Sequence, residues 1–171
     1  MLKTKDFYYD LPEELIAQTP VYPRDSSRLL VYDREKDSVS HERFYDLPKY
    51  LKKGDLLVVN DTKVYPARLY AYTEHGGKVE ILLLKRLDLT DWECLVKPGK
   101  KAREGVKLVV NEELSLTVKS RTPTGERIVS FSFDGVFEDI LSRVGEMPLP
   151  PYIHEKLADK DRYQTVYAKY E

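Results

Sequence analysis

The sequence lacks the features that mark secreted, membrane or disulfide-rich proteins. Its one cysteine, Cys94, excludes an intramolecular disulfide and suits a reducing compartment. No apolar run approaches the roughly 20 residues needed to cross a bilayer, and the opening MLKTKDFYYDLPEEL has no apolar signal-peptide core. We therefore expect a cytoplasmic protein with no membrane partner.

An excess of positive charge is also missing. Lysine and arginine number 28 against 29 aspartates and glutamates. No long-range positive field therefore attracts nucleic acid, and any RNA contact has to be local.

Signature motifs of several enzyme classes are absent as well. The three histidines, His41, His75 and His154, are scattered without ligand spacing, so we expect no metal. The sequence contains no GxGxxG, GxxxxGK[ST] or GxSxG run. Dinucleotide-binding, P-loop and serine-hydrolase interpretations are therefore without support.

What is present begins with a strong β pattern. The chain has 171 residues, 42% of them hydrophobic, which is enough to bury a core in one domain or two small ones. Short apolar runs separated by turn residues predict six strands at 67–73, 78–87, 92–96, 107–110, 114–120 and 127–133. Because open edges invite aggregation, such strands close on themselves or pair as sheets. We predict a small six-stranded antiparallel β-barrel.

The flanking segments mix helical and extended patterns. Capping residues predict short helices at 14–17 and from Asp46 to near Gly54, and a further helix is expected at 136–144. Strands are predicted at 28–32, 38–42 and 55–59. The predicted fold class is therefore a mixed α/β domain, residues 1–66 and 146–171, with the barrel inserted at 67–145.

A polar cluster follows the strand predicted at 55–59. Asn60, Asp61, Thr62 and Lys63 stand where a buried strand would surface, a common position for ligand-binding groups. They could bind ribose hydroxyls, an amino group or a carboxylate. Alternatively, Asn60 and Asp61 bond neighbouring amides as a local cap. Arg68 could reach the same site or lie on a solvated strand face.

A second polar cluster lies between Pro23 and the strand predicted at 28–32. It consists of Arg24, Asp25, Ser26, Ser27 and Arg28. The guanidinium groups could hold a phosphate or carboxylate in bidentate geometry while the serines add donors. Alternatively, Asp25 pairs with Arg24 or Arg28 and fixes the loop; both can hold together.

A third cluster is cationic. Lys97, Lys100, Lys101 and Arg103 face one acid, Glu104, in a loop around Pro98 and Gly99. Such a loop could contact RNA phosphates in a salt-dependent way, or it could simply be solvated.

The order of six segments resembles one family, S-adenosylmethionine:tRNA ribosyltransferase-isomerase of queuosine biosynthesis. The segments are PRDSSRLLV, GDLLVVNDTKVYPARL, GGKVEILLL, CLVKPGKKAREG, PLPPYI and RYQTVYA. That family's chains continue with a segment like PTAGLHFT, so this sequence resembles an amino-terminal portion. The family pattern places Tyr163, Gln164 and Thr165 at the border of the pocket, and it also agrees with an inserted barrel.

The resemblance implies a reaction and its partners. The ribosyl part of S-adenosylmethionine, a cosubstrate and not a prosthetic group, is moved onto 7-aminomethyl-7-deazaguanine in tRNA, giving epoxyqueuosine. This chemistry needs a base, assistance to the departing adenine and a neutral amine, and Asp61 is our hypothesis for the acid/base or ribose-binding carboxylate. Alternatives are a tRNA-binding module without catalysis, an inactive fragment, or a purely structural barrel. We expect a monomer.

Overall fold

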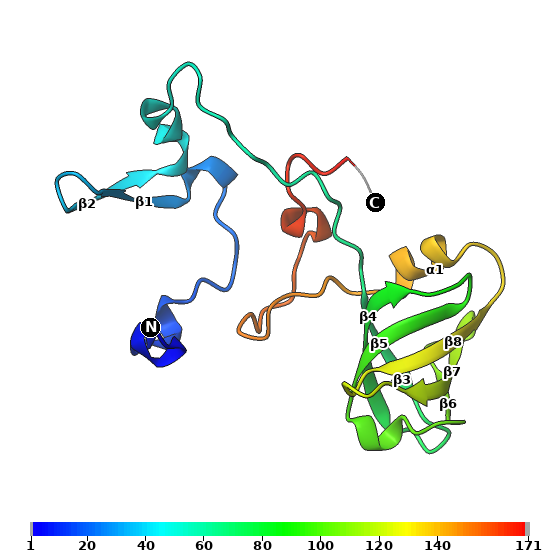
Figure 1. Ribbon diagram of the computed structural model, residues 1–171. Helices are drawn as coiled ribbons and strands as arrows, with labels where there is room; N and C mark the ends of the chain where they lie inside the picture. The colour runs from blue at the N-terminus through cyan, green and yellow to red at the C-terminus, as the bar shows by residue number, and fades with distance from the viewer. Residues whose placement is uncertain (1, 170–171) are drawn as a thin grey trace. The chain divides into compact units, whose positions relative to one another are not determined.

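The computed structural model describes residues 2–169 and divides into two compact units (Figure 1). The first unit combines residues 2–62 with 150–169, and the barrel unit spans Lys63–Leu149. Within residues 2–169, no helix is both long and apolar enough to cross a bilayer.

The barrel unit is a closed sheet in the strand order β3-β4-β5-β8-β7-β6, and every neighbouring pair is antiparallel. This confirms the predicted six-stranded barrel. Each strand lies within a residue of its predicted bounds: β3 Arg68–Tyr72, β4 Lys78–Arg86, β5 Asp91–Lys97, β6 Lys107–Val109, β7 Leu114–Arg121 and β8 Arg127–Phe133.

The barrel interior is filled by alternate residues of each strand. On β7, Leu114, Leu116 and Val118 are each 1% exposed, while Ser115 and Thr117 between them face outward. Cys94 of β5 is also inside, and its burial raises the pKa of the thiol to about 12. The interior is therefore a packed apolar core.

Helix α1 (Phe137–Val144) covers one end of this core and confirms the helix predicted at 136–144. The Phe137 ring packs against the rings of Trp92, Phe131 and Phe133 at centroid distances of 5.6, 5.1 and 5.2 Å. After the helix, Gly145 approaches Pro66 so closely that an added Cβ would lie 2.2 Å from the Pro66 carbonyl oxygen. Only glycine fits this junction.

The two ends of the barrel segment are joined to each other. The Arg68 amide donates to the Glu146 carbonyl at 3.1 Å, and the Glu146 amide donates back at 2.8 Å. The Arg68 side chain pairs with Glu80 at 3.1 Å and donates to the Leu149 carbonyl. The chain therefore enters and leaves the barrel at one place, as a segment inserted into another domain does.

The first unit contains one antiparallel pair, β1 (Arg28–Asp33) and β2 (Ser38–Arg43), which confirms the strands predicted there. Otherwise it has short 3-10 helices: η1 Thr4–Phe7, η2 Glu13–Leu15, η3 Arg24–Ser26, η4 Phe44–Tyr50 and η6 Lys160–Tyr163. None of its described residues is buried. The unit supplies extended segments and turns without a closed core.

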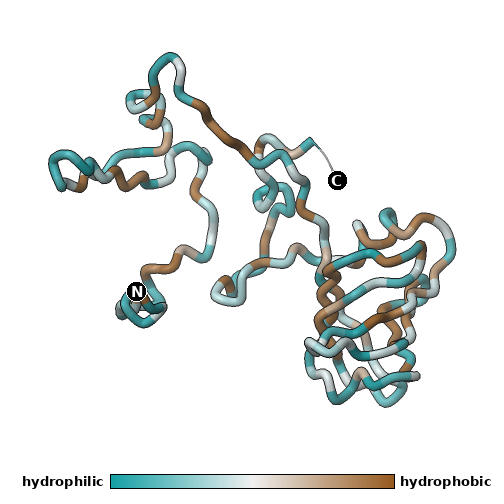
Figure 2. The backbone as a smooth tube through the Cα atoms, viewed as in Figure 1, coloured by the Kyte–Doolittle hydropathy of each residue, from teal (hydrophilic) through white to brown (hydrophobic). Residues whose placement is uncertain are grey.

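Three predictions for the first unit need correction. The helix predicted at 14–17 is the single 3-10 turn η2, and the one predicted from Asp46 is the 3-10 helix η4, which begins at Phe44. The strand predicted at 55–59 was wrong, because no described strand pairs with it. Its apolar side chains, Leu56 to Val59, are 47 to 89% exposed, and Figure 2 shows them as a brown stretch of bare chain after η4.

Candidate functional site

The candidate site lies in the first unit, where the Arg24 side chain joins two distant parts of the sequence. Its guanidinium donates to the Gln164 carbonyl at 2.6 Å and to the Asp161 carbonyl at 2.7 Å. Pro23 precedes the 3-10 turn η3 that presents Arg24, and the Ser26 hydroxyl closes this turn by donating to the Pro23 carbonyl at 2.6 Å. The structure thus brings the PRDSSR and RYQT segments together.

A second arginine makes the reciprocal contact. Arg162 of η6 donates to the Val21 carbonyl at 2.5 Å, so each segment sends a guanidinium to the backbone of the other. The Asp159 carboxylate caps η6 by accepting from the Asp161 amide. Both arginines donate to backbone carbonyls, and the charge of the guanidinium strengthens these hydrogen bonds.

The cluster after residue 59 reaches the same carboxy-terminal segment. The Asp61 carbonyl accepts a hydrogen bond from the Lys169 amide at 2.9 Å. The Asn60 side chain accepts from the Thr62 amide at 2.9 Å, which is the local cap considered from the sequence. The side chain of Asp61 is exposed, which leaves its carboxylate accessible to a ligand.

The RYQT residues form the bridge between these clusters. Tyr163, Gln164 and Thr165 are each half-buried, and Gln164 provides the carbonyl that Arg24 binds. The Thr165 hydroxyl accepts from the Tyr167 amide at 3.3 Å and so shapes the turn that precedes Lys169. One short segment therefore contacts both Arg24 and Asp61.

Other predicted binding residues take different places. Arg28 lies on β1 opposite Arg43, and both line a hollow of about 270 Å³ with His41, Glu42 and Asp46. Asp25 is exposed, and within residues 2–169 no ion pair joins it to Arg24 or Arg28. Lys63 and Arg68 belong to the barrel unit, where Arg68 is ion-paired with Glu80. A ligand role for these four remains a prediction.

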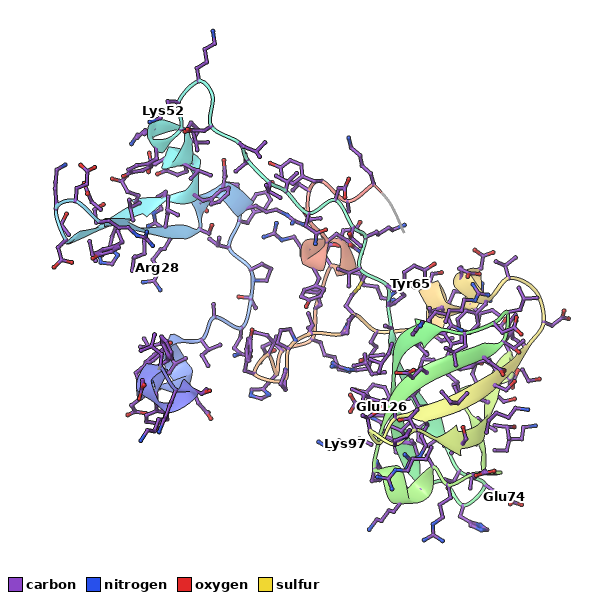
Figure 3. All side chains as sticks on the ribbon, viewed as in Figure 1. Arg28, Lys52, Tyr65, Glu74, Lys97 and Glu126 are labelled. Atoms are coloured by element: carbon purple, nitrogen blue, oxygen red, sulfur yellow. The ribbon has the colours of Figure 1, made fainter. Side chains whose placement is uncertain are left out.

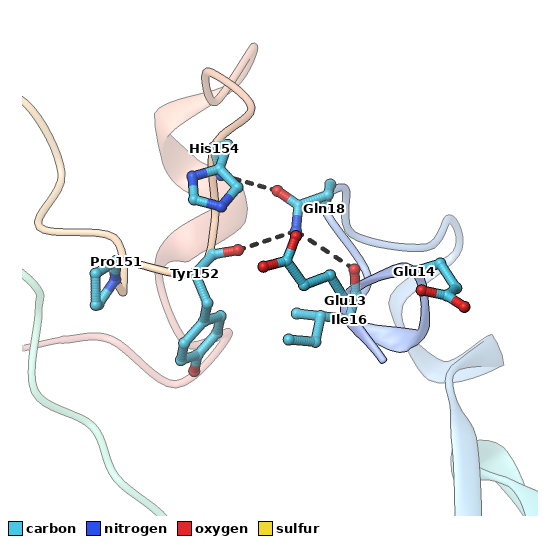
Figure 4. Close-up of a pocket in the computed structure, with 7 residues that line it drawn as sticks. All are labelled: Glu13, Glu14, Ile16, Gln18, Pro151, Tyr152 and His154. Atoms are coloured by element: carbon cyan, nitrogen blue, oxygen red, sulfur yellow. Dashed lines mark hydrogen bonds between the residues drawn. The ribbon is translucent and has the colours of Figure 1, made fainter. Parts of the chain in front are cut away.

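One pocket was not found from the sequence. Figure 4 shows Gln18 between Ile16 and the segment at Tyr152 and His154, beside a hollow of about 590 Å³. The Gln18 side chain donates to the Tyr152 carbonyl at 3.0 Å and accepts from the His154 amide at 2.8 Å. Gln18 therefore joins two parts of the first unit that are 134 residues apart. A lone glutamine in the sequence carries no signal for such a contact.

The cationic loop lies on the barrel unit, around η5 (Gly99–Lys101). Lys97, Lys100 and Arg103 are exposed, and Lys101 is half-buried. Arg127 holds the loop from inside: its guanidinium donates to the carbonyls of Ala102 at 2.8 Å, Gly125 at 2.6 Å and Gly99 at 3.3 Å. The cations are thus presented by a fixed backbone.

In the neighbouring turn at residues 122–126, the Glu126 carboxylate is hydrogen-bonded within the turn itself. Thr122 and Thr124 donate their hydroxyls to the Glu126 carboxylate and lower its pKa to about 2. Figure 3 labels Glu126 and Lys97, and both lie on the barrel unit. Among the described residues no three His, Cys, Asp or Glu side chains gather as metal ligands do.

Comparison with known proteins shows the family to which the chain belongs. The model of the family described as queuosine biosynthesis protein matches residues 4–171, so this chain belongs to that family.

Individual members of this family are similar to the chain over nearly its whole length. The chain is 56% identical over 172 residues to the S-adenosylmethionine:tRNA ribosyltransferase-isomerase of Caldanaerobacter subterraneus subsp. tengcongensis, covering 99% of this chain and 50% of that one. It is 55% identical to the enzyme of the same name from Symbiobacterium thermophilum, covering 98% and 50%. The chain thus spans about half the length of the curated relatives it matches.

One solved structure is also similar in sequence. The crystal structure of S-adenosylmethionine tRNA ribosyltransferase from Thermotoga maritima is 49% identical, over 74% of this chain and 44% of that one, with a TM-score of 0.37.

Proposed function

We propose that this chain is the amino-terminal half of an enzyme that transfers and isomerises the ribosyl part of S-adenosylmethionine onto 7-aminomethyl-7-deazaguanine in tRNA, with epoxyqueuosine as product. The family and the relatives' names support the class of reaction. The observation that carries the proposal to particular residues is the convergence of Arg24 and Asp61 on the segment 161–169.

In this proposal the first unit binds the cosubstrate. Arg24 is occupied by carbonyls, so its task is to position Tyr163, Gln164 and Thr165. Asn60 fixes the turn at Thr62 and thereby the direction of the neighbouring Asp61 carboxylate. An exposed carboxylate on a fixed turn can accept hydrogen bonds from ribose hydroxyls. It can also act as a base for the proton that the neighbouring sulfonium acidifies, provided that the carboxylate lies within hydrogen-bonding distance of that proton.

We also propose that the first unit is part of a discontinuous α/β domain completed by chain outside this sequence, with Lys63–Leu149 as the insertion. Two observations support this: none of the described residues of the first unit is buried, and the run from Leu56 to Val59 has the apolar pattern of a buried strand while lying 47 to 89% exposed. A strand of this composition is stable only between neighbours.

The decisive experiment measures adenine release from S-adenosylmethionine in the presence of tRNA that carries the aminomethyl base. It uses a protein of the relatives' full length with this chain as its amino-terminal half. We expect release that depends on both substrates. A protein that binds such tRNA without releasing adenine would reject the proposed activity and favour a non-catalytic tRNA-binding module.

The role of Asp61 is tested in the same assay. Asp61→Asn keeps the shape of the side chain but removes the base, so we expect turnover to fall by a factor of about 10²–10⁴. Asp55→Asn is the matched control, because Asp55 is also exposed and its carboxylate accepts from the Lys52 amide and from no other group within residues 2–169. If Asp61→Asn keeps the turnover and substrate affinity of the parent, Asp61 is not the acid/base group.

A further inference from the structure

The barrel carries its charge asymmetrically along its axis. The turns 73–77, 98–106 and 122–126 lie at one end, because β4 begins there and β5 and β7 finish there. With the adjoining strand ends these segments read TEHGGK, KPGKKAREGVK and KSRTPTGER, nine lysines or arginines against three glutamates. We call this the basic end.

The opposite end, which α1 covers, is acidic. Its segments 66–68, 85–93, 110–114 and 132–146 hold four lysines or arginines against nine aspartates or glutamates. The nearly neutral total of the sequence hides this separation. Only the strand order and register bring the basic segments, distant in sequence, to one place.

The two ends also treat their charges differently. At the acidic end arginines are neutralised: Arg86 pairs with Glu138 at 2.6 Å and Arg143 with Glu113 at 2.9 Å. At the basic end no lysine or arginine makes an ion pair within residues 2–169, and the Glu126 carboxylate is taken up by threonine hydroxyls. The nine cations there outnumber the three glutamates by six, and this excess of positive charge is available to an anion.

The basic end is shaped as well as charged. A hollow of about 700 Å³ lies between the turn 73–77, the η5 loop and β6, and its lining includes His75, Lys101 and Lys107. A Cβ added to Gly77 would lie 3.1 Å from the Lys101 ammonium nitrogen, so this lysine lies across the turn. Figure 3 places Glu74, beside His75, at this end of the barrel. Arg127 fixes the loop by its carbonyl contacts.

We infer that the basic end is a binding surface for the phosphodiester backbone of RNA, with Lys107 and Lys119 contributing beyond the η5 loop. The inference rests on the proposed function for its choice of RNA among polyanions. Several cations spaced along a rigid surface suit a repeating phosphate chain, and they bind without reading bases. The barrel would thus hold the tRNA body while the first unit holds the cosubstrate.

The test compares three double variants of the 171-residue chain for binding to an unmodified tRNA transcript across a salt series. Lys100→Gln with Arg103→Gln removes two loop cations, and Lys107→Gln with Lys119→Gln removes two strand-end cations. Lys52→Gln with Lys53→Gln makes the same charge change at exposed positions of the first unit. Circular dichroism establishes that each variant is folded.

We expect each basic-end pair to weaken tRNA binding and to reduce the slope of log K against log salt by about 2, while the control pair leaves both unchanged. If the control pair loses as much tRNA affinity as the basic-end pairs, the effect comes from net charge alone and the inference is overturned. Unchanged tRNA binding by both basic-end pairs would also overturn it. Equal affinity for polyglutamate would also overturn it, in favour of an acidic protein partner. Adenine release by the unsubstituted enzyme tests the proposed function separately.

Discussion

The barrel unit and the first unit use similar apolar patterns with opposite results. In β7, Leu114, Leu116 and Val118 are each 1% exposed, whereas in the first unit the equally apolar run from Leu56 to Val59 is 47 to 89% exposed. The barrel finds all its strand partners within 87 consecutive residues, from Lys63 to Leu149. Burial therefore depends on whether a partner strand is present and not on composition alone.

The largest loss of stability should come from a substitution that leaves a cavity in the barrel core. Leu116→Ala removes a fully enclosed side chain, so we expect it to lower the free energy of unfolding by about 2–5 kcal/mol. Leu57→Ala, the same change at a side chain 59% exposed, should stay within about 0.5 kcal/mol in this chain. Urea unfolding followed by circular dichroism measures both. Equal losses would break the comparison between the two units.

The two arginine clamps give the next largest contrast. Arg127 in the barrel and Arg24 in the first unit both bind backbone carbonyls. Arg127→Gln leaves the half-buried loop carbonyls short of a donor, so we expect a loss of about 1–3 kcal/mol in barrel stability. Arg24→Gln should leave the barrel transition in place and speed amide exchange around Gln164. A shift of the barrel transition by Arg24→Gln would show that the two units unfold together.

Alkaline pH should lower the stability of the barrel unit through the ionisation of Cys94, which lies in that unit. Its pKa of about 12 in the folded barrel lies above the ordinary thiol value of 9.0, so the unfolded thiol loses its proton first as the pH rises. Stability is then lost between pH 9 and 12, by about 1.4 kcal/mol at pH 10. Cys94→Ala should flatten this part of the pH profile. Rapid alkylation of the native thiol at pH 8 would contradict the burial of Cys94.

The smallest effect concerns the turn at the basic end. Because the pKa of Glu126 is lowered from 4.5 to about 2, the stability that its threonine contacts provide is present above pH 4.5 and lost as the pH falls toward 2. Glu126→Gln should remove part of the acid dependence of barrel unfolding. An identical acid profile for parent and variant would mean that the exposed hydrogen bonds contribute nothing measurable.

The sequence was sufficient for the barrel because its information is local. Turns such as Gly76-Gly77 and Asn111 to Glu113 join strands that pair directly with each other, so period and turn chemistry predict the strands themselves. The order was not predicted, because β5 pairs with β8 and β6 with β3, which are not consecutive along the chain. The strand expected at 55–59 failed because its partner is not encoded nearby. A pattern of side chains predicts what a segment can do only where the complementary segment follows it.

The candidate site was predicted less completely, for a related reason. Arg24 and Gln164 were both selected, yet nothing in the sequence indicates that residues 140 positions apart share a hydrogen bond. The basic loop was recognised, but the separation of charge along the barrel depends on register, which places Lys107 and Lys119 near that loop. The sequence was enough to select individual residues by their chemical type. Which of them lie together could be seen only from the fold.

Hydrogen exchange, measured with S-adenosylmethionine alone and with tRNA alone, tests the proposed roles of the two units most directly in a protein of the relatives' full length that carries this chain as its amino-terminal half. We predict that tRNA slows amide exchange in the segments 73–77 and 98–106 of the barrel, and that S-adenosylmethionine slows it around Arg24, Asp61 and Gln164. Protection by tRNA at the acidic end of the barrel, or protection of the same segments by both substrates, would contradict this account.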